Sequence, residues 1–456
     1  MSIGSYKCKI LLLWCSPGFG VVDIWLPVIK KLKEKENIKI YFIFPESSSL
    51  LLENKNSDLF NIAEQFLDKV VYRGYSGRWF VASTLIEART EIKFSSLDRK
   101  IEIFSIRLLY GKGSKYFFLK ALGKYISIIS KYFIRIKENI GNQVPYDFSL
   151  LNDVDGILCD IVKEGKSTNK ELRNECKNIL RFSMFHAMGA IWATPSFTCK
   201  EAIEKRSDVI VYSMSHLEES GYKKCFGILK ENIIHAGIPR HDDDWIKFIC
   251  NKAATVEGDL FDLFVFVIGR PASSLIPPER KKKTLRDMYN VICIEHQLKL
   301  VIKLHPKESL DGIDGDIYRD ALGLENYGKN WVFSDRHPFV LGKEAIFCVS
   351  FFSGVVKDML ALNKPTIEYL DLSGLALHDN KESLRDECGK PVFQYRYANL
   401  VLGADSRKDL ECHVEMILNH YKEVTFPLYL KYKEYYSPFN GSSKMVANDI
   451  YKRITI

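Results

Sequence analysis

The stretch Leu300-Val301-Ile302-Lys303-Leu304-His305-Pro306-Lys307-Glu308 is an apolar run that ends at a His-Pro step followed by charge. A second apolar run, residues 345–350, passes into Phe351-Phe352-Ser353-Gly354 and then into a helical pattern. Short apolar runs that stop at proline or glycine predict buried strands. Ligands of open α/β sheets bind outside the carboxyl ends of the strands. We therefore expect one pocket, lined by His305 and by serines of the second run, that suits a nucleotide phosphate.

Strand-like runs alternate with helical patterns in both halves of the chain. The runs are residues 9–15, 38–44, 154–162, 179–185, 209–212 and 233–236, then 263–268, 299–304, 331–333, 345–350 and 365–370. This alternation predicts parallel sheets with right-handed helical crossovers. A chain of 456 residues exceeds what one hydrophobic core usually spans. The sequence therefore predicts an α/β fold with two doubly wound, Rossmann-like domains facing a cleft.

Composition places the boundary between these domains in the polar stretch 251–259, which we expect to be a hinge. The expected domains are an N-terminal, acceptor-side domain over residues 1–250 and a C-terminal, nucleotide-binding domain over 260–426. Residues 427–456 form an aromatic and basic tail. A final helix over residues 444–453 is expected to pack back toward the first domain.

Composition and charge also narrow the class of protein. With 46% hydrophobic and 27% charged residues, the chain is globular. Its net charge of +8 suits an anionic nucleotide or a membrane surface, and no nucleic-acid-binding module is evident. The eleven cysteines include no Cys-x-x-Cys pair, which favours reduced thiols and no zinc site. We expect no metal and no cofactor. No apolar stretch approaches the roughly 20 residues of a spanning helix, so we expect a cytoplasmic protein.

One segment, residues 115–139, combines apolar residues at helical spacing with many cations. The basic residues are Lys115, Lys120, Lys124, Lys131, Arg135 and Lys137, and Glu138 is the only acid. Such a helix can lie on an anionic membrane, here the inner face of the cytoplasmic membrane. Alternatively, it packs against its own domain and exposes a solvated basic face.

Several motifs resemble a known family. Gly237-Ile238-Pro239-Arg240-His241-Asp242 resembles the Gly-x-Pro-Arg-x-Asp signature of CDP-glycerol glycerophosphotransferases. Lys303-Leu304-His305-Pro306 matches the Lys-x-His-Pro strand end of that family, and Ser350, Ser353 and Lys364-Pro365 match its serine pair and Lys-Pro step in part. The resemblance covers roughly residues 180–370. It implies the GT-B architecture of nucleotide-sugar transferases and a cytidine-nucleotide donor.

A second group with the same plan is similar as well. Bacterial CMP-sialic acid and CMP-Kdo transferases share a His-Pro motif and a later serine motif, and Asp153-Val154-Asp155-Gly156 matches their acidic motif only in part. The chain also departs from the first family. Val349-Ser350-Phe351-Phe352-Ser353 replaces an adjacent Asp-Tyr-Ser-Ser run, and His186-Ala187 replaces a His-Gly step. Both groups imply cell-surface polymers, and they differ in the group transferred.

Transfer from a nucleotide donor leaves charge on a departing phosphate, which hydroxyls, amides and cations stabilise without a metal. The candidate donor-binding residues are Arg240, Arg270, Lys303, His305, Glu308, Ser350, Ser353 and Gly354. Each has a structural alternative. Pro306 can simply end a strand, the serines can cap a helix, and Arg240 can pair with Asp242 or Asp243. Glu308 either accepts from a ribose or base, or is a helix N-terminal charge.

The acceptor hydroxyl must lose a proton to a carboxylate or histidine of the opposing domain. The candidates are Asp155, Asp160, Glu164 and His186. If configuration is retained, one carboxylate is instead the nucleophile. Alternatively, acids near strand ends form turns or surface charges.

The primary interpretation is therefore a metal-independent transferase that uses a cytidine-nucleotide donor, either a CMP-ulosonic acid such as Kdo or sialic acid, or CDP-glycerol. Its acceptor would be a saccharide or a lipid-linked saccharide of the bacterial cell surface. A second interpretation is a UDP-N-acetylglucosamine 2-epimerase of the same architecture, which shares a helix start like Gly441-Ser442-Ser443. A third is a non-catalytic protein that binds membrane or nucleic acid.

Overall fold

The computed structural model describes the chain in segments and divides it into two compact units. The described residues are 8–15, 20–44, 57–72, 116–119, 121–126, 128–129, 154–161, 179–186, 205–253, 261–273, 276–305, 308, 313–381, 383–438 and 440–455. The first unit holds the described residues up to Asp242 and those from Pro438 onward, and the second runs from Asp243 to Ser437. The division falls before the expected hinge because α9 (Asp243–Ala253) packs on α12 (Pro338–Glu344) of the second unit.

The first unit contains a seven-stranded parallel sheet in the order β3-β2-β1-β4-β5-β6-β7. Its strands are β1 (Lys9–Trp14), β2 (Ile38–Phe44), β3 (Lys69–Tyr72), β4 (Gly156–Asp160), β5 (Arg181–Met184), β6 (Val209–Ser213) and β7 (Ile233–His235). The strand order reverses between β1 and β4, which lie side by side with Leu11 opposite Gly156. In open α/β sheets the crevice at such a switch point, outside the carboxyl ends of the strands, is where ligands bind.

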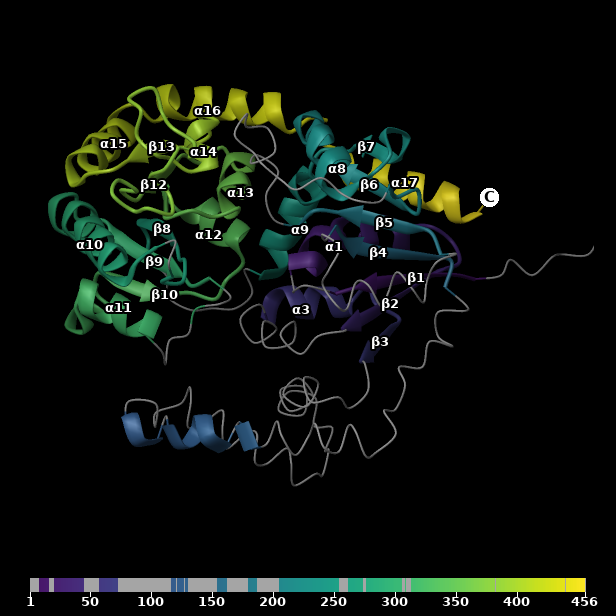
Figure 1. Ribbon diagram of the computed structural model, residues 1–456, viewed down its shortest axis with the longest axis horizontal. Coiled ribbons are helices and arrows are strands. Elements are labelled where there is room, and N and C mark those ends of the chain that lie inside the picture. The colour runs from purple at the N-terminus through teal and green to yellow at the C-terminus, as the bar shows by residue number, and fades with distance from the viewer. Residues whose placement is uncertain are drawn as a thin grey trace, which may run out of the picture. The chain divides into compact units, whose positions relative to one another are not determined.

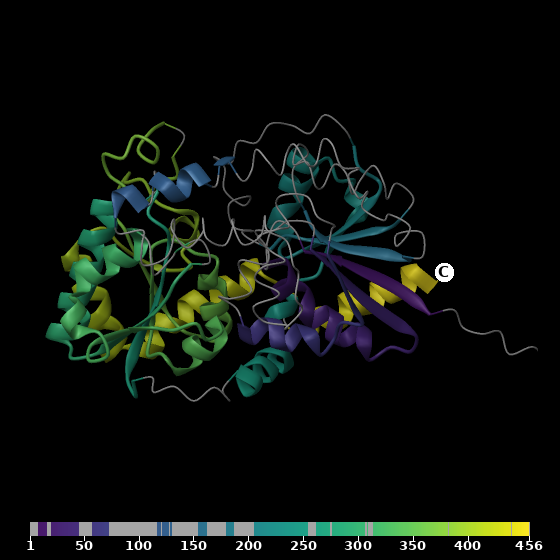
Figure 2. The ribbon, with the colours of Figure 1, turned by 90° about the horizontal axis from the view of Figure 1, so that it is seen from below.

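Two helices distant in sequence pack together in this unit. They are α1 (Gly20–Lys33) and the terminal helix α17 (Ser442–Thr455). Figure 2 shows α17 in yellow, ending at the labelled C-terminus, beside the purple first part of the chain. The α1 indole of Trp25 is buried and donates a hydrogen bond to the carbonyl oxygen of Cys159 on β4, at 3.1 Å. This bond joins α1 to the carboxyl end of β4.

The first unit also has several short helical elements. They include α3 (Ser57–Glu64), η5 (His216–Glu218), α8 (Glu219–Phe226), η6 (Lys230–Asn232) and η7 (Pro239–His241). Helix α8 ends at Gly227, whose φ of 67° is the left-handed conformation that favours glycine after a helix.

The second unit contains a six-stranded parallel sheet in the order β10-β9-β8-β11-β12-β13. Its strands are β8 (Phe264–Ile268), β9 (Lys299–Lys303), β10 (Trp331–Phe333), β11 (Cys348–Ser350), β12 (Thr366–Tyr369) and β13 (Leu402–Ala404). The central strand β8 is buried along its whole length, as its continuous apolar sequence predicts for a parallel sheet covered on both faces.

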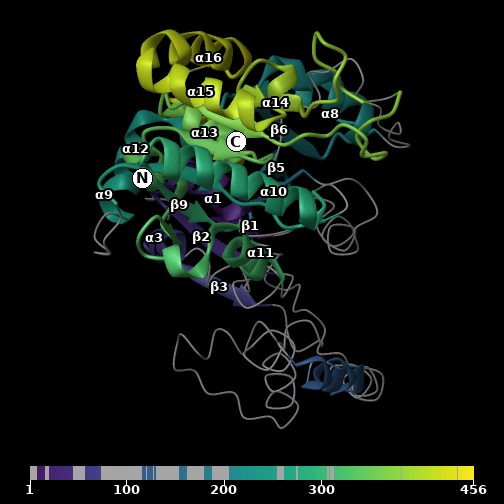
Figure 3. The ribbon, with the colours of Figure 1, turned by 90° about the vertical axis from the view of Figure 1, so that its left-hand side faces the viewer.

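Helices cover both faces of this sheet, with α10 (Pro278–Met288) and α11 (Ile313–Leu322) on one side and α12 and α13 (Val355–Ala361) on the other (Figure 1). The remaining elements are η8 (Tyr289–Glu295), η9 (Leu324–Asn326), α14 (Gln394–Tyr397), α15 (Arg407–Asn419) and α16 (Tyr421–Tyr435). Helices α15 and α16 pack against each other (Figure 3).

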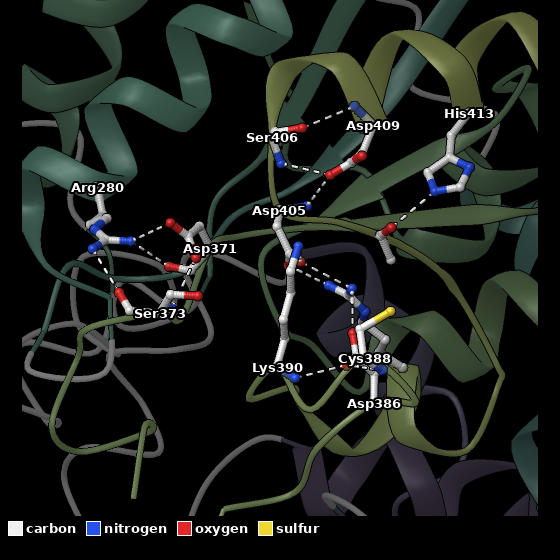
Figure 4. A network of polar contacts seen from close by, with 12 residues as sticks. Arg280, Asp371, Ser373, Asp386, Cys388, Lys390, Asp405, Ser406, Asp409 and His413 are labelled. Atoms are coloured by element: carbon white, nitrogen blue, oxygen red, sulfur yellow. Dashed lines mark hydrogen bonds and ion pairs between the residues drawn. The ribbon is translucent and has the colours of Figure 1, made fainter.

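Polar contacts fix the segment between β12 and α15 (Figure 4). Ser406 caps α15, because its hydroxyl accepts from the amide of Asp409 at 3.2 Å and the Asp409 carboxylate accepts from the amide of Ser406 at 3.0 Å. Lys390 pairs with Asp405 at 3.1 Å in the same network.

The structure confirms the strand-like runs read from the sequence and corrects one expectation about the cysteines. Cys225 is in a disulfide bond. The expectation of reduced thiols is therefore wrong for this residue, because pairing depends on proximity in the fold and not on sequence spacing. Cys159 and Cys293 are free thiols, and burial raises their pKa to about 11 and about 12.

Between residues 117 and 129 the described residues are helical. Their large apolar side chains are exposed, including Phe117 at 89% and Phe118 at 74%. Most of the cations of the 115–139 segment lie outside the described residues, and Lys124 lies within them. Nowhere in the described ranges is a helix both long enough and apolar enough to cross a membrane.

Candidate functional site

The first unit brings together two of the four acid–base candidates, Asp160 and His186. Asp160 is the last residue of β4, and His186 follows the neighbouring strand β5. Nδ1 of His186 lies 2.7 Å from Oδ2 of Asp160, and the backbone amide of His186 donates to Oδ1 at 3.1 Å. The Asp160 side chain is 2% exposed and that of His186 is 28% exposed. A buried carboxylate thus holds a partly accessible imidazole at the carboxyl ends of adjacent strands.

This arrangement can act as a general base. A carboxylate at Nδ1 holds the proton on that nitrogen, which leaves the basic lone pair on Nε2 and stabilises the imidazolium once Nε2 takes a proton. Gly20, the first residue of α1, lies against the ring, since a Cβ atom there would be 3.1 Å from Cδ2 of His186. The dyad therefore lies at the start of α1.

The other two acid–base candidates do not join this pair in the structure. Asp155 precedes β4, at the opposite end of the strand from Asp160. Its carboxylate is 3.0 Å from Nζ of Lys9 and accepts from the amide of Ile10 at 2.8 Å, so Asp155 fastens β1 to β4. Glu164 lies outside the described residues.

The Gly-x-Pro-Arg-x-Asp motif also lies in the first unit, where it receives the end of the chain. Arg240 pairs with Asp23 of α1 at 2.6 Å. The buried carboxylate of Asp242 accepts from the amides of Ser442 and Ser443, at 3.0 and 2.8 Å, and thereby caps α17.

Gly237 opens this motif with a φ of 70°. A Cβ atom there would lie 2.3 Å from the carbonyl oxygen of Pro438, so the returning chain excludes any side chain. Arg240 was a candidate for donor binding, yet it belongs to the first unit and not to the sheet that carries the other donor candidates. In this structure the motif is the attachment point of α17.

In the second unit, the carboxyl ends of β9, β8 and β11 are neighbours in the sheet. They lead to His305, Arg270 and Ser353 respectively. The guanidinium carbon of Arg270 lies 5.0 Å from the ring centre of Phe352, and burial lowers the pKa of this guanidinium. Arginine stacked on an aromatic ring is held flat while its N–H groups remain directed outward. The predicted strand-end pocket thus has three of its expected residues on adjacent strands.

The remaining donor candidates have defined local roles. Nζ of Lys303 donates to the carbonyl oxygen of Asp335 at 2.9 Å. The Ser353 hydroxyl accepts from the amide of Val355 at 3.3 Å, and Gly354 is the N-cap residue of α13. Ser350 is fully buried, and its hydroxyl makes no hydrogen bond to any residue that the structure describes.

Glu308 is fully buried, which excludes direct contact with a ribose or base in this conformation. Its Oε1 is 2.6 Å from Nζ of Lys281 and accepts from the hydroxyl of Tyr318 at 3.1 Å. Its Oε2 accepts from the amide of His305 at 2.6 Å. Burial raises the pKa of the Glu308 carboxyl, and Lys281 opposes that shift.

Two buried acids of the second unit, Asp358 and Glu368, are not among the candidates predicted from the sequence. Asp358 lies in the first turn of α13 beside buried Lys357, a charged pair inside an apolar helical pattern. Glu368 lies on β12 opposite Ser350 of β11, and burial raises its pKa to about 8 although Arg396 lowers it. The sequence feature that could have indicated Glu368 is an acid within the apolar strand that follows Lys364-Pro365.

Phe352 stacks on Phe393, with ring centres 4.2 Å apart. This contact joins segments that are distant in sequence.

No family model matches the chain, and no curated protein sequence is significantly similar to it. Among the described residues, no group of three His, Cys, Asp or Glu side chains is arranged to hold a metal ion.

Solved structures do resemble it. The UDP-GlcNAc 2-epimerase from Neisseria meningitidis bound to UDP-GlcNAc has a TM-score of 0.53 and 11% identity, over 97% of this chain and 100% of that one. The UDP-GlcNAc 2-epimerase from Methanocaldococcus jannaschii in complex with UDP-GlcNAc and UDP has a TM-score of 0.53 and 12% identity, over 98% and 100%. A variant of the wall teichoic acid polymerase TagF has a TM-score of 0.52 and 11% identity, over 98% and 89%.

At these identities the likeness is one of fold. Two α/β units, each built on a parallel sheet with helical crossovers, give the chain a two-domain fold of the GT-B type. The epimerases and the polymerase with this fold are enzymes by name. Fold alone does not define a reaction, so function has to be inferred from the side chains at the strand ends of each unit.

Proposed function

We propose that the chain is a transferase of the GT-B type that uses a cytidine-nucleotide-activated donor to extend or modify a bacterial cell-surface polysaccharide. The observation that carries the proposal is the Asp160–His186 pair at the carboxyl ends of β4 and β5. A hydroxyl acceptor needs a base of this kind, and a buried carboxylate behind the imidazole keeps the ring in the tautomer that accepts a proton at Nε2.

In the proposed reaction, the acceptor hydroxyl gives its proton to Nε2 of His186 while its oxygen attacks the donor. With a CMP-ulosonic acid, the new bond forms to the anomeric carbon, and the bond from that carbon to the phosphate oxygen breaks. With CDP-glycerol, the new bond forms to the β-phosphorus, and the bridging P–O bond to the α-phosphate breaks. CMP is the leaving group in both cases, so both donor classes produce the same nucleotide.

The second unit would bind the departing phosphate. Arg270 and His305 follow neighbouring strands and supply cationic and hydrogen-bonding groups there. Negative charge that develops on CMP is stabilised by such preorganised donors, and the chemistry needs no metal ion. The choice of cytidine rests on the resemblance of Lys303-Leu304-His305-Pro306 and the serines that follow to transferases with cytidine donors.

A second candidate function is a UDP-N-acetylglucosamine 2-epimerase, which the fold of two solved structures favours. The Gly441-Ser442-Ser443 start of α17 was the sequence feature behind this alternative. In the structure, however, the amides of Ser442 and Ser443 already donate to Asp242. Because these two amides already have an acceptor, the sequence feature that suggested an epimerase has a structural role here. The transferase is therefore the better-supported candidate.

The proposal includes peripheral contact with the inner face of the cytoplasmic membrane, where lipid-linked acceptors would be reached. The supporting observation is the exposed apolar side chains of the described helical residues between 117 and 129, among them Phe117, Phe118 and Tyr125. The surrounding sequence carries many cations and one acid, which complements an anionic lipid surface.

Thermal-shift measurements on the full chain with CMP, CDP, UMP and UDP test the donor assignment. A shift selective for the cytidine nucleotides supports the proposal, and a shift selective for UMP and UDP favours the epimerase. His305→Ala should lose the response while the protein remains folded. The proposal is contradicted if no nucleotide shifts the melting temperature of the wild-type protein.

A further inference from the structure

A fully buried lysine joins the two loops of the second unit that carry Arg270 and His305. Lys281 lies on α10, and its side chain is 0% exposed. Its amine is 2.6 Å from Oε1 of Glu308 and 3.0 Å from Oδ1 of Asp314 on α11. The amine also lies 4.4 Å from the ring centre of Tyr318. A buried ammonium persists only when it is paired and hydrogen-bonded in this way.

Each carboxylate that Lys281 holds in turn holds a backbone amide at the end of one strand. Glu308 accepts from the amide of His305, after β9, at 2.6 Å. Asp314 accepts from the amide of Ala272, two residues beyond Arg270 and after β8, at 2.8 Å. Because β8 and β9 are paired, the ammonium group of Lys281 holds in place the segments that follow two neighbouring strands.

Gly269, the first residue after β8, shows how closely this cluster lies beneath the strand ends. A Cβ atom there would be 2.6 Å from Oε2 of Glu308 and 2.9 Å from the hydroxyl oxygen of Tyr318. The Gly269 amide donates to the carbonyl oxygen of Lys303 at 2.8 Å, which joins the end of β8 to the end of β9. A shift of the cluster would therefore be transmitted directly to both loops.

We propose that Lys281 is a positioning residue of the donor site: it touches no donor and sets the relative positions of Arg270 and His305. The inference rests on the proposed function. One buried cation between two carboxylates is a costly way to fill a core, because apolar side chains of similar volume are often as stabilising or more so. What the charged cluster adds over an apolar core is a fixed direction for the two amides that lead to the phosphate-binding side chains.

The test compares Lys281→Met with the wild-type full chain by calorimetric titration with CMP and with CDP, well below the unfolding temperature of each protein. We expect affinity for the nucleotide that binds the wild type to fall by about tenfold or more, with the stoichiometry unchanged. Lys282→Met is the matched control, since that amine pairs with Asp320 near the surface at 3.0 Å. It should leave the affinity unchanged.

A lower melting temperature for Lys281→Met with unchanged affinity would overturn the inference, because a purely structural cluster affects only stability. If Lys281→Met does not fold, the same titration is made with Glu308→Gln. This variant keeps an acceptor for the His305 amide and removes the charge that Lys281 binds. Unchanged affinity in Glu308→Gln then overturns the inference. Failure of the wild type to bind CMP or CDP overturns the proposed function itself, and the inference with it.

Discussion

The carboxylate of Asp160 accepts two hydrogen bonds from one residue, from the backbone amide of His186 at 3.1 Å and from Nδ1 of its ring at 2.7 Å. The first bond fixes where the chain leaves β5, and the second fixes the ring. The imidazole is thus oriented by the strand next to its own. Such an arrangement favours a base role, since a histidine that only filled space would need no buried carboxylate behind it.

Replacing Asp160 by Asn should reduce the rate of CMP release by about 10² to 10⁴-fold, because the ring would lose its orientation and the stabilisation of its protonated form. Affinity for CMP should stay within about twofold, since Asp160 belongs to the first unit, whereas Arg270 and His305 belong to the second. Steady-state kinetics and calorimetry on the same preparation measure both quantities.

The matched control is Asp155→Asn at the other end of β4. It removes the ion pair between Asp155 and Lys9, whose side chains are 26% and 32% exposed, respectively. The rate should stay unchanged. Equal losses of rate in the two variants would contradict the assignment of the base.

Glu368→Gln should change how stability depends on pH. Burial raises the pKa of Glu368 from 4.5 to about 8. Between these two pH values the carboxyl is protonated in the folded state and ionised in the unfolded state. The stability contributed by that proton is complete below pH 4.5 and is lost as pH rises through about 8. The glutamine cannot ionise and should therefore be more stable than the wild type at about pH 8, by roughly 4 kcal/mol.

Urea denaturation at about pH 5 and about pH 8 checks this difference. Glu415→Gln, on the exposed face of α15, is the control and should follow the wild-type pH profile. Parallel pH profiles for the wild type and Glu368→Gln would show that Glu368 is ionised in the folded state.

Asp242→Ala should loosen α17. The substitution leaves the amides of Ser442 and Ser443 without their acceptor, which should cost about 2 kcal/mol of unfolding free energy. Faster hydrogen exchange at the start of α17 would locate the effect. Asp243→Ala, one residue along and exposed, should change stability by about 0.5 kcal/mol or less. Similar exchange rates in both variants would contradict the capping role.

Lys124→Glu combined with Phe117→Ser and Phe118→Ser should weaken binding to vesicles that contain anionic lipid, because it removes both exposed apolar area and positive charge. Co-sedimentation with phosphatidylglycerol vesicles and with neutral vesicles measures the effect. Lys329→Glu, at an exposed position of the second unit, is the charge control. Equal binding of all variants would contradict membrane contact through this helix.

The fold could be predicted from the sequence because buried parallel strands are continuous apolar runs. Residues 38–44 and 331–333 were predicted with the same bounds as β2 and β10. Strand β13 was not predicted, since Leu402–Ala404 is three residues long and includes a glycine. The domain division at Asp242 was missed because it depends on what α9 packs against, which composition does not report.

The candidate site was predictable only in part. Asp160 and His186 could be proposed as strand-end residues, but their pairing depends on β4 lying next to β5. The sequence predicts donor binding for Arg240 from its motif and for Glu308 from its position three residues beyond His305. Their partners, Asp23 and Lys281, are distant in sequence, and no local pattern indicates ion pairs of that kind.

The most direct measurement is the nucleotide that the full chain releases from CDP-glycerol, CMP-sialic acid, CMP-Kdo and UDP-N-acetylglucosamine, resolved by chromatography. We predict release of CMP from at least one cytidine donor, undiminished by a chelator and strongly reduced in Asp160→Asn. Conversion of UDP-N-acetylglucosamine to its C2 epimer, with no CMP released from any cytidine donor, would contradict it.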